Sequence, residues 1–529
     1  MKTIGELTTA LKAGRLTRRE FLQAAAALGI VAPLANSLLI TPSQAQPKSG
    51  GTLRLATDGT STGDSLDPAT YATTYMLMLG FGTHNTLTEL LADGELVGEL
   101  AESWESSPDA RVWTFQLRQG IEFHNSKTMT ADDVVASLNY HRNEDSKSAA
   151  KGVFEGVTDI KADGPNTLVV TLASGNADLP FQFIDYHLLV FPSKDGAIDW
   201  RDYQGTGGYV LEEFEPGVRT VMKRNPNYWK SGRAHVDEVV MLAINDINAR
   251  QNALTTGEVH AINRVDLKTV NLLARRPGIR IEESTGYLHY TAPMLTNIAP
   301  FDNNDVRLAL KYGIDREAML ATILKGHGTL ANDHPIAPNI RFHADGLEQR
   351  RYDPERARYH LKQAGLENLK VNLSAAEAAY VGAVDAAVLY REHAAKAGID
   401  INVVREPSDG YWSNVWMKKP FCQCYWGGRP TADWMFSQAY AADANWNDTA
   451  WKHERFNELL VAARAELDES KRADMYTEMQ RLVRDEGGVV VWAFANYVYG
   501  LAEAVGYEGE MAGTWEMDGG RAVERWWLS

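Results

Sequence analysis

The stretch that decides the fold reads WTFQLRQGIEFH over residues 113–124 and continues as TADDV over residues 130–134. Every second residue from Trp113 to Leu117 is apolar, which is the period of a half-buried strand. Thr130, followed three positions later by Asp133, is typical of a capped helix N-terminus. The region therefore predicts a strand followed closely by a helix.

The same mixture extends through the rest of the chain. Residues 51–56 alternate as a strand does, and Asp353-Pro354 with Gly365 delimits one helix. A second helix is expected over residues 470–486. Its apolar stripe consists of Met475, Met479, Leu482 and Val483. With 529 residues, the chain is long enough for more than one lobe, and an α/β architecture is predicted.

The N-terminus has the pattern of an export signal. Arg18 and Arg19 precede an apolar stretch over residues 24–35, which is too short to span a bilayer. The paired arginines predict the twin-arginine type, which is an address read by a receptor. Small residues at Ser43 and Ala45 predict cleavage after Ala45 and a periplasmic location for the mature protein.

Charge excludes one large class of function. The chain has 53 basic and 69 acidic residues and a net charge of -16. Removal of residues 1–45 takes away five positive and two negative residues, so the expected mature charge is -19. Nucleic-acid binding needs a concentrated positive surface, and no run of Lys and Arg in the body of the chain supplies one. The acidic balance otherwise indicates solubility.

Cys422 and Cys424 are the only cysteines. In a strand they would lie on the same face, and an oxidising compartment would permit a disulfide, although closure across one residue is strained. Ordinary buried thiols are the favoured alternative. Neither a second pair of cysteines nor paired histidines lies near enough for a zinc site.

Ordered motifs carry a family resemblance. These are SLDPA at 65–69, the stretches quoted above, GTGGY at 205–209, RNPNYW at 224–229, DVRLAL at 305–310 with IDRE at 314–317, and YDPERA at 352–357. In this order they resemble the peptide, opine and nickel family (extracellular family 5) of ABC-transporter periplasmic solute-binding proteins. Gly208 stands where that family usually has a proline, which affects a turn.

The resemblance implies a periplasmic-binding-protein type II-like fold with two lobes, a hinge and an extra subdomain in the first lobe. Ligand would lie between the lobes and be enclosed as they close. By position, the expected divisions are 46–88, 208–302 and 491–529 for lobe 1, 89–207 for the subdomain and 303–490 for lobe 2. The implied protein is a monomer without cofactor or metal that serves an inner-membrane ABC permease.

Several signature residues have structural explanations. Asp133 and Asp315 stand where helix N-termini need an acceptor, and Trp113 fits a buried strand position. His124 follows an alternating strand and has no nucleophile partner in sequence, which favours a packed or capping histidine.

Better site candidates lie in the aromatic segment around residues 411–434. Arg429 can clamp a carboxylate through two parallel bonds, and Asp433 can hold an ammonium. In peptide-binding relatives an acidic residue of this segment meets the ligand's amino group. Asp433 is the matching position, although the usual Asp-Pro is here Asp433-Trp434. An alternative is that Arg429 and Asp433 pair with each other while the tryptophans form core.

The expected ligand-binding residues are Trp426, Arg429, Asp433, Trp434 and Trp412, with Tyr71, Tyr75 and Asn496 as further candidates. They favour a protein that captures a small zwitterionic or cationic solute, such as a short peptide, an opine-like compound or an amino-acid derivative. Binding of nickel or a metal chelate is the alternative. A secreted hydrolase is disfavoured because no recognisable nucleophile or metal motif occurs.

Overall fold

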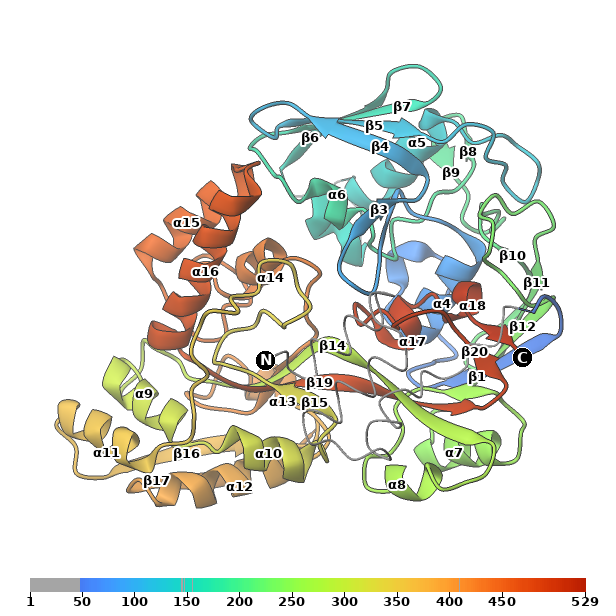
Figure 1. The fold of residues 1–529 in the computed structure, drawn as a ribbon. Helices are drawn as coiled ribbons and strands as arrows, with labels where there is room; N and C mark the ends of the chain where they lie inside the picture. Colours follow the sequence, from blue (N-terminus) through green and yellow to red (C-terminus); the bar gives the residue numbers. More distant parts are fainter. Residues whose placement is uncertain (1–47, 144–145, 147, 155, 409) are drawn as a thin grey trace, which may run out of the picture.

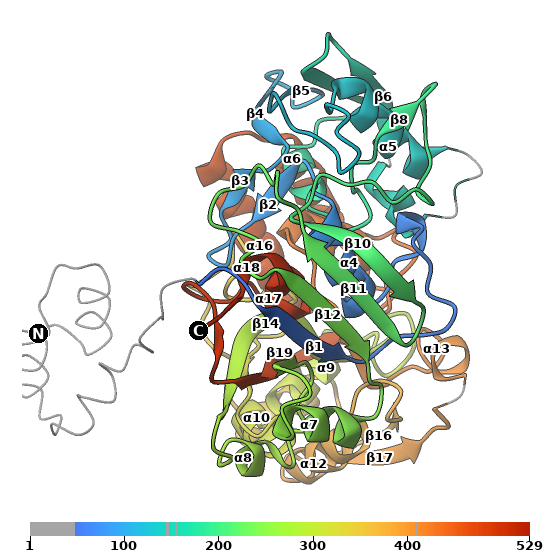
Figure 2. The ribbon, with the colours of Figure 1, turned by 90° about the vertical axis from the view of Figure 1, so that its right-hand side faces the viewer.

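The computed structural model describes residues 48–143, 146, 148–154, 156–408 and 410–529. The predicted signal, residues 1–45, lies outside these ranges. Figure 1 shows two lobes joined by long central strands, with an additional subdomain at the top of the right-hand lobe. Figure 2 shows this subdomain above the sheet of the first lobe. The predicted two-lobed α/β fold with an extra subdomain is confirmed.

One large sheet runs through both lobes. Within the described residues it has nine strands, in the order β10-β11-β12-β1-β13-β19-β14-β18, with β15 paired to β19. Their bounds are β1 Thr52–Thr57, β10 Tyr209–Glu215, β11 Arg219–Arg224, β12 Glu238–Ala243, β13 Ala261–Ile262, β14 Ile279–Pro293, β15 Gly328–Leu330, β18 Cys424–Trp426 and β19 Val489–Ala502. The predicted strand at 51–56 is therefore confirmed as β1.

Strands β14 and β19 connect the lobes. They pair antiparallel from Ile279 with Ala502 to Pro293 with Val489, and their register is interrupted between Thr285 and His289. At this interruption a Cβ on Gly286 would lie 2.7 Å from a backbone oxygen of Ala495, so the close approach of the two strands needs a glycine. We expect the hinge between the lobes to lie at this interruption.

Core packing indicates where the chain changes lobe. Met294 and Phe301 pack in a second-lobe core together with Trp492 and Ala495 of β19, whereas Tyr499 packs in the core of the first lobe. The change therefore takes place inside β14 and β19. The divisions expected at 302 and 491 stay predictions. The packing favours a division before 302 in β14 and one after 491 in β19.

The remaining first-lobe elements surround the sheet. They are η1 Pro68–Thr70, α4 Thr74–Thr83, α7 Ile247–Thr255, α8 Val270–Leu273, β20 Val505–Gly506, α17 Glu516–Gly519, α18 Ala522–Arg525 and β21 Trp527–Leu528. Helix α4 is buried along nearly its whole length, so it forms the centre of the lobe.

The extra subdomain is built on the stretch quoted at the start. Strand β5 pairs with β4 and β7, and Thr130 and Asp133 form a capping box at the start of α5, with Asp133 Oδ2 accepting from Thr130 N at 2.9 Å. Both sequence predictions are confirmed. The subdomain elements are β2 Thr88–Leu90, β3 Leu96–Gly98, β4 Ala101–Ser106, β5 Val112–Leu117, α5 Ala131–Arg142, η2 Ala149–Phe154, β6 Val157–Ala162, β7 Thr167–Leu172, α6 Leu179–Gln182, β8 Ser193–Lys194 and β9 Ala197–Ile198.

The second lobe is mainly helical. Its elements are α9 Asn304–Tyr312, α10 Arg316–Ile323, α11 Pro354–Gln363, β16 Leu369–Ala375, α12 Ala383–Ala395, β17 Ile399–Arg405, α13 Tyr411–Asn414, α14 Ala432–Ala439, α15 Glu454–Ala465 and α16 Glu469–Glu486. Asp353 caps α11 as predicted. In α16, Met479 and Val483 of the predicted stripe are buried, while Met475 and Leu482 are half-buried.

The signature residues have the structural roles expected of them. Asp315 accepts from Ala318 N at 3.0 Å, and Trp113 is buried. His124 Nε2 lies 3.1 Å from the oxygen of Gly207. Cys422 and Cys424 are free and buried. Among the described residues no helix is both long and apolar enough to cross a membrane.

A buried charge network joins the subdomain to the first lobe. Glu99 accepts from Arg521 at 2.8 Å and from Lys230 at 2.6 Å, while Glu89 pairs with Arg525 at 2.7 Å. Lys230 also pairs with Glu524 at 3.1 Å. These acids alternate with bases, so each buried charge has a partner of opposite sign.

Candidate ligand-binding cavity

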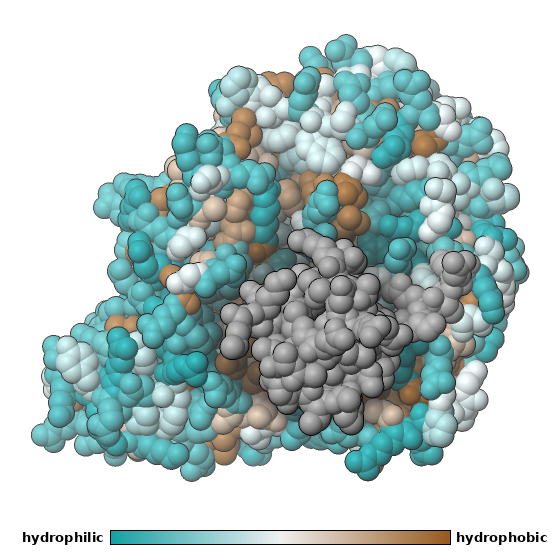
Figure 3. All heavy atoms as spheres, in the orientation of Figure 1, coloured by the Kyte–Doolittle hydropathy of each residue, from teal (hydrophilic) through white to brown (hydrophobic). Residues whose placement is uncertain are grey.

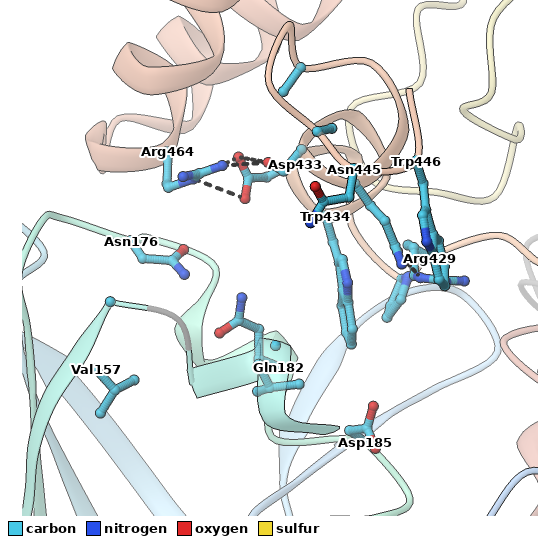
Figure 4. A pocket seen from close by; sticks show the side chains of 18 of the residues that line it. Val157, Asn176, Gln182, Asp185, Arg429, Asp433, Trp434, Asn445, Trp446 and Arg464 are labelled. Atoms are coloured by element: carbon cyan, nitrogen blue, oxygen red, sulfur yellow. Dashed lines mark hydrogen bonds and ion pairs between the residues drawn. The ribbon is translucent and has the colours of Figure 1, made fainter. Parts of the chain in front are cut away.

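A cavity of about 910 Å³ lies between the subdomain and the second lobe. Figure 4 shows its two sides: Val157, Asn176, Gln182 and Asp185 face Arg429, Asp433, Trp434 and Trp446. Trp515 adds a wall from the first lobe. In Figure 3 apolar side chains gather in the recess between the upper and left-hand parts of the molecule, while the outer face is mostly hydrophilic. A cavity of this size between lobes is typical of a small-molecule site.

Strand β18 and the turn after it place Arg429 at this cavity. Trp426 pairs with His289 of β14, and a Cβ on Gly428 would lie 2.1 Å from the Cβ of Tyr287. Only a glycine allows this approach of the backbone. Thr431 then caps α14 by accepting from the backbone N–H of its third residue at 3.2 Å.

Arg429 is a positive charge without a carboxylate partner. Its Nε donates to Gln438 Oε1 at 2.6 Å, and its Nη1 donates to the carbonyls of Gly427 at 2.5 Å and Gly428 at 3.2 Å. Among the ion pairs of the described residues, none involves Arg429. Burial lowers the pKa of the Arg429 guanidinium. The group is held in place by neutral acceptors, and it forms no ion pair with a carboxylate of the described residues.

Asp433 already has a partner. Its carboxylate accepts from Arg464 Nε at 3.1 and 3.2 Å, as Figure 4 shows, and Arg464 also donates to Ser437. Burial raises the pKa of Asp433 to about 6, and Arg464 offsets part of that effect. The alternative in which Arg429 and Asp433 pair with each other is wrong. The expected ammonium-binding carboxylate is instead neutralised by the protein itself.

The predicted tryptophans divide into three groups. Trp434 lines the cavity. Trp426 is buried behind it, where its indole donates to Asp448 Oδ2 at 3.1 Å. Trp412 is 40% exposed, packs edge-on against Tyr425, and does not line the cavity.

The remaining candidates lie away from the cavity. Tyr71 and Tyr75 are buried in the first-lobe core, where their hydroxyl groups bond Tyr203 at 2.7 Å and Thr220 at 2.8 Å. Asn496 lies in β19 and donates to Glu283 at 3.0 Å. Nearness to a motif in sequence therefore did not place these side chains at the cavity.

Other lining residues were missed in the sequence. They include Asn176, Gln182, Asp185, Tyr186, His187, Trp446, Arg464 and Trp515. Burial opposes the charges of Asp185 and His187, but their 2.6 Å pairing outweighs it, lowering the pKa of Asp185 and raising that of His187. No local motif marks these residues, although the aromatic density near Trp446 was a usable signal. In the described ranges, no group of three or more His, Cys, Asp or Glu side chains could hold a metal.

Comparisons with known proteins agree with this architecture. A dipeptide-binding protein of Escherichia coli K12 is 26% identical over 461 residues, covering 78% of this chain and 83% of that protein. A Helicobacter pylori periplasmic binding protein in complex with the peptide STSA has a TM-score of 0.72 at 24% identity, over 91% of this chain and 99% of that one. An Agrobacterium tumefaciens R10 binding protein in complex with agropinic acid has a TM-score of 0.71 at 24% identity, over 90% and 99%.

The fold is thus that of the type II periplasmic binding proteins. The chain belongs to the bacterial extracellular solute-binding proteins of family 5, whose model matches residues 95–448, more than half of its length. The family resemblance expected from the ordered motifs is confirmed.

Proposed function

We propose that this chain captures a small solute that carries a carboxylate, closes its lobes around it, and delivers it to the membrane permease of an ABC importer. The observation that carries the proposal is Arg429, a half-buried guanidinium at the interlobe cavity that forms no ion pair among the described residues. The Helicobacter pylori protein of the same fold is described as associated with an ABC transporter, which supports delivery to a permease.

Physical chemistry supports a ligand-binding role for Arg429. Arg429 is half-buried, so its ionised group has lost part of its hydration, and hydrogen bonds to carbonyl oxygens recover only part of that cost. A ligand carboxylate would supply the missing charge through short, charge-assisted hydrogen bonds. The closed, liganded state would then have better contacts than the open state, which is what drives hinge closure.

The cavity also restricts the charge of the solute. Both buried carboxylates that line it, Asp185 and Asp433, are already paired with protein cations. Asp443, which is exposed, has no ion pair among the described residues. An acidic or zwitterionic solute therefore fits the cavity better than a purely cationic one.

Native mass spectrometry of gently purified protein tests the proposal. We expect a non-covalent adduct with the mass of a small organic acid, absent from the Arg429→Gln variant and retained by Arg201→Gln, which removes an exposed arginine of the subdomain. An adduct of a neutral sugar, or a nickel complex retained equally by both variants, would contradict a carboxylate bound at Arg429.

We propose that the protein reaches the periplasm by twin-arginine export and acts there as a monomer. Replacing Arg18 and Arg19 by lysine is expected to leave uncleaved precursor in the cell interior, whereas Arg15→Lys should not. Cell fractionation and size-exclusion chromatography of the mature protein measure both points. Equal export of the two variants would contradict the assigned route.

A further inference from the structure

Three tryptophans at the cavity have indole N–H groups without acceptors. None of the hydrogen bonds of the described residues involves the indoles of Trp434, Trp446 or Trp515. By contrast, the neighbouring indoles of Trp416 and Trp426 both donate to Asp448 Oδ2, each at 3.1 Å. The cavity-lining indoles therefore keep both a flat apolar face and an unused donor.

Trp446 is the most exposed of these rings and stands on a fixed base. Its side chain is 45% exposed, and its ring centroid lies 6.3 Å from that of Trp416 and 5.9 Å from that of Trp426. Because Asp448 anchors both supporting indoles, they cannot move away without losing a hydrogen bond to a buried carboxylate. A large exposed aromatic ring on a rigid base at a cavity is typical of a ligand-stacking surface.

Rings face the cavity from its other sides as well. The Arg429 guanidinium lies 6.0 Å from the centroid of the Trp434 ring, so the unpaired cation is next to a flat surface. Tyr186, on the subdomain side, packs edge-on against Trp515 at 5.4 Å with an angle of 86°. The cavity thus combines one cation with aromatic walls from all three parts of the fold.

We propose that the solute is an aromatic acid, whose carboxylate binds Arg429 and whose ring packs against Trp446 and Trp434. The carboxylate part rests on the function proposed above, whereas the ring part rests on the tryptophans alone. Stacking of aromatic rings adds affinity beyond the burial of apolar surface, so a ring should improve binding at a fixed carboxylate.

Four synthetic probes separate the two contributions. They are N-acetylphenylalanine, N-acetylalanine and the primary amides of both, titrated by calorimetry into mature protein freed of co-purified solute by unfolding in guanidinium chloride and refolding. We expect the ring to strengthen binding about tenfold and the carboxylate about tenfold or more. In Trp446→Ala the gain from the ring should be lost while the gain from the carboxylate remains.

Trp412→Ala is the matched control. Trp412 is similarly exposed, at 40%, and contacts the same Trp416, but it does not line the cavity. This variant should keep both gains. Trp446→Phe should restore most of the ring gain, and thermal melting of all three variants checks that they fold.

The outcomes distinguish the two proposals. If the carboxylate strengthens binding but the ring does not, the proposal of an aromatic acid is wrong and the carboxylate site at Arg429 remains supported. If the ring strengthens binding but the carboxylate does not, the proposed role of Arg429 is wrong and recognition of the ring remains supported. Failure of all four probes to bind, or an equal loss of the ring gain in Trp412→Ala, overturns the inference.

Discussion

Two groups of charged side chains border the subdomain, and they differ in how their charges are compensated. On the first-lobe side, Glu99 is fully buried and contacts both Arg521 and Lys230 within 2.8 Å. On the second-lobe side, Arg429 contacts only carbonyl and amide oxygens. Each charge of the first arrangement has an opposite charge beside it, whereas Arg429 in the second forms no ion pair among the described residues. Whether a charged side chain is paired within the protein therefore distinguishes structural residues from candidate site residues more clearly than its residue type does.

The largest effect is expected at the scaffold. Glu99→Gln leaves Arg521 and Lys230 short of a counter-charge, so the free energy of unfolding should fall by about 3–5 kcal/mol. Urea denaturation measures it. Glu102→Gln, an exposed change on β4, should alter stability by less than about 0.5 kcal/mol. Equal effects of the two changes would show that the network is not what holds this junction.

In contrast to Glu99→Gln, Arg429→Gln should weaken ligand binding without destabilising the fold. Binding of N-acetylphenylalanine should weaken by about 2 kcal/mol, or roughly thirtyfold, because a charge-assisted bond is lost. The free energy of unfolding should stay the same or rise, since a half-buried cation that forms no ion pair among the described residues is removed. Calorimetry and urea denaturation of the same samples report both. Destabilisation comparable to that of Glu99→Gln would place Arg429 in the scaffold.

The pH dependence should differ between the two groups. Burial alone would raise the pKa of Glu99, but Arg521 and Lys230 hold it below its usual value, so its stabilisation is present above about pH 4.5 and is lost as the pH falls.

The contribution of Asp433 to stability changes with pH in the opposite direction to that of Glu99. Its pKa is raised from 3.8 to about 6, so the folded chain binds this proton more tightly than the unfolded chain does. Its contribution favours folding at low pH and is lost, by about 2 kcal/mol, as the pH rises from about 4 to about 6. Asp433→Asn should remove this dependence from urea denaturation series measured between those values. An unchanged slope in the variant would contradict the raised pKa.

The smallest effect concerns closure of the cleft. Asp178 of the subdomain pairs with Arg472 of α16 at 2.8 Å, both buried, and Ala177 N donates to the carbonyl of Arg464 at 2.7 Å. Opening the lobes would break this contact. Asp178→Asn should therefore weaken ligand binding by about 1 kcal/mol and enlarge the unliganded protein in small-angle X-ray scattering. Asp199→Asn, an exposed change on the subdomain, is the control.

Local elements were predictable because their causes are local. Helix N–H groups are satisfied by residues only a few positions away in sequence. Examples are the capping box of Thr130 and Asp133, and Asp353 before Pro354. Trp434 and Arg429 were predicted as site residues because aromatic and charged residues lie beside two glycines, and both line the cavity. Tyr71 and Tyr75 were misleading because an aromatic residue with a polar tip suits a core as well as a pocket.

By itself, the sequence determined the α/β class and the family. The export signal at the N-terminus and the ligand-binding role of the segment containing Arg429 stay predictions. Only the tertiary structure decided which charges in that segment are free. Asp433 is neutralised by Arg464, 31 positions away, while Arg429 has no such partner. Tyr186 and Trp515 reach the same cavity from the other parts of the fold. Charge compensation depends on distance in space, and chain folding sets that distance independently of local sequence pattern.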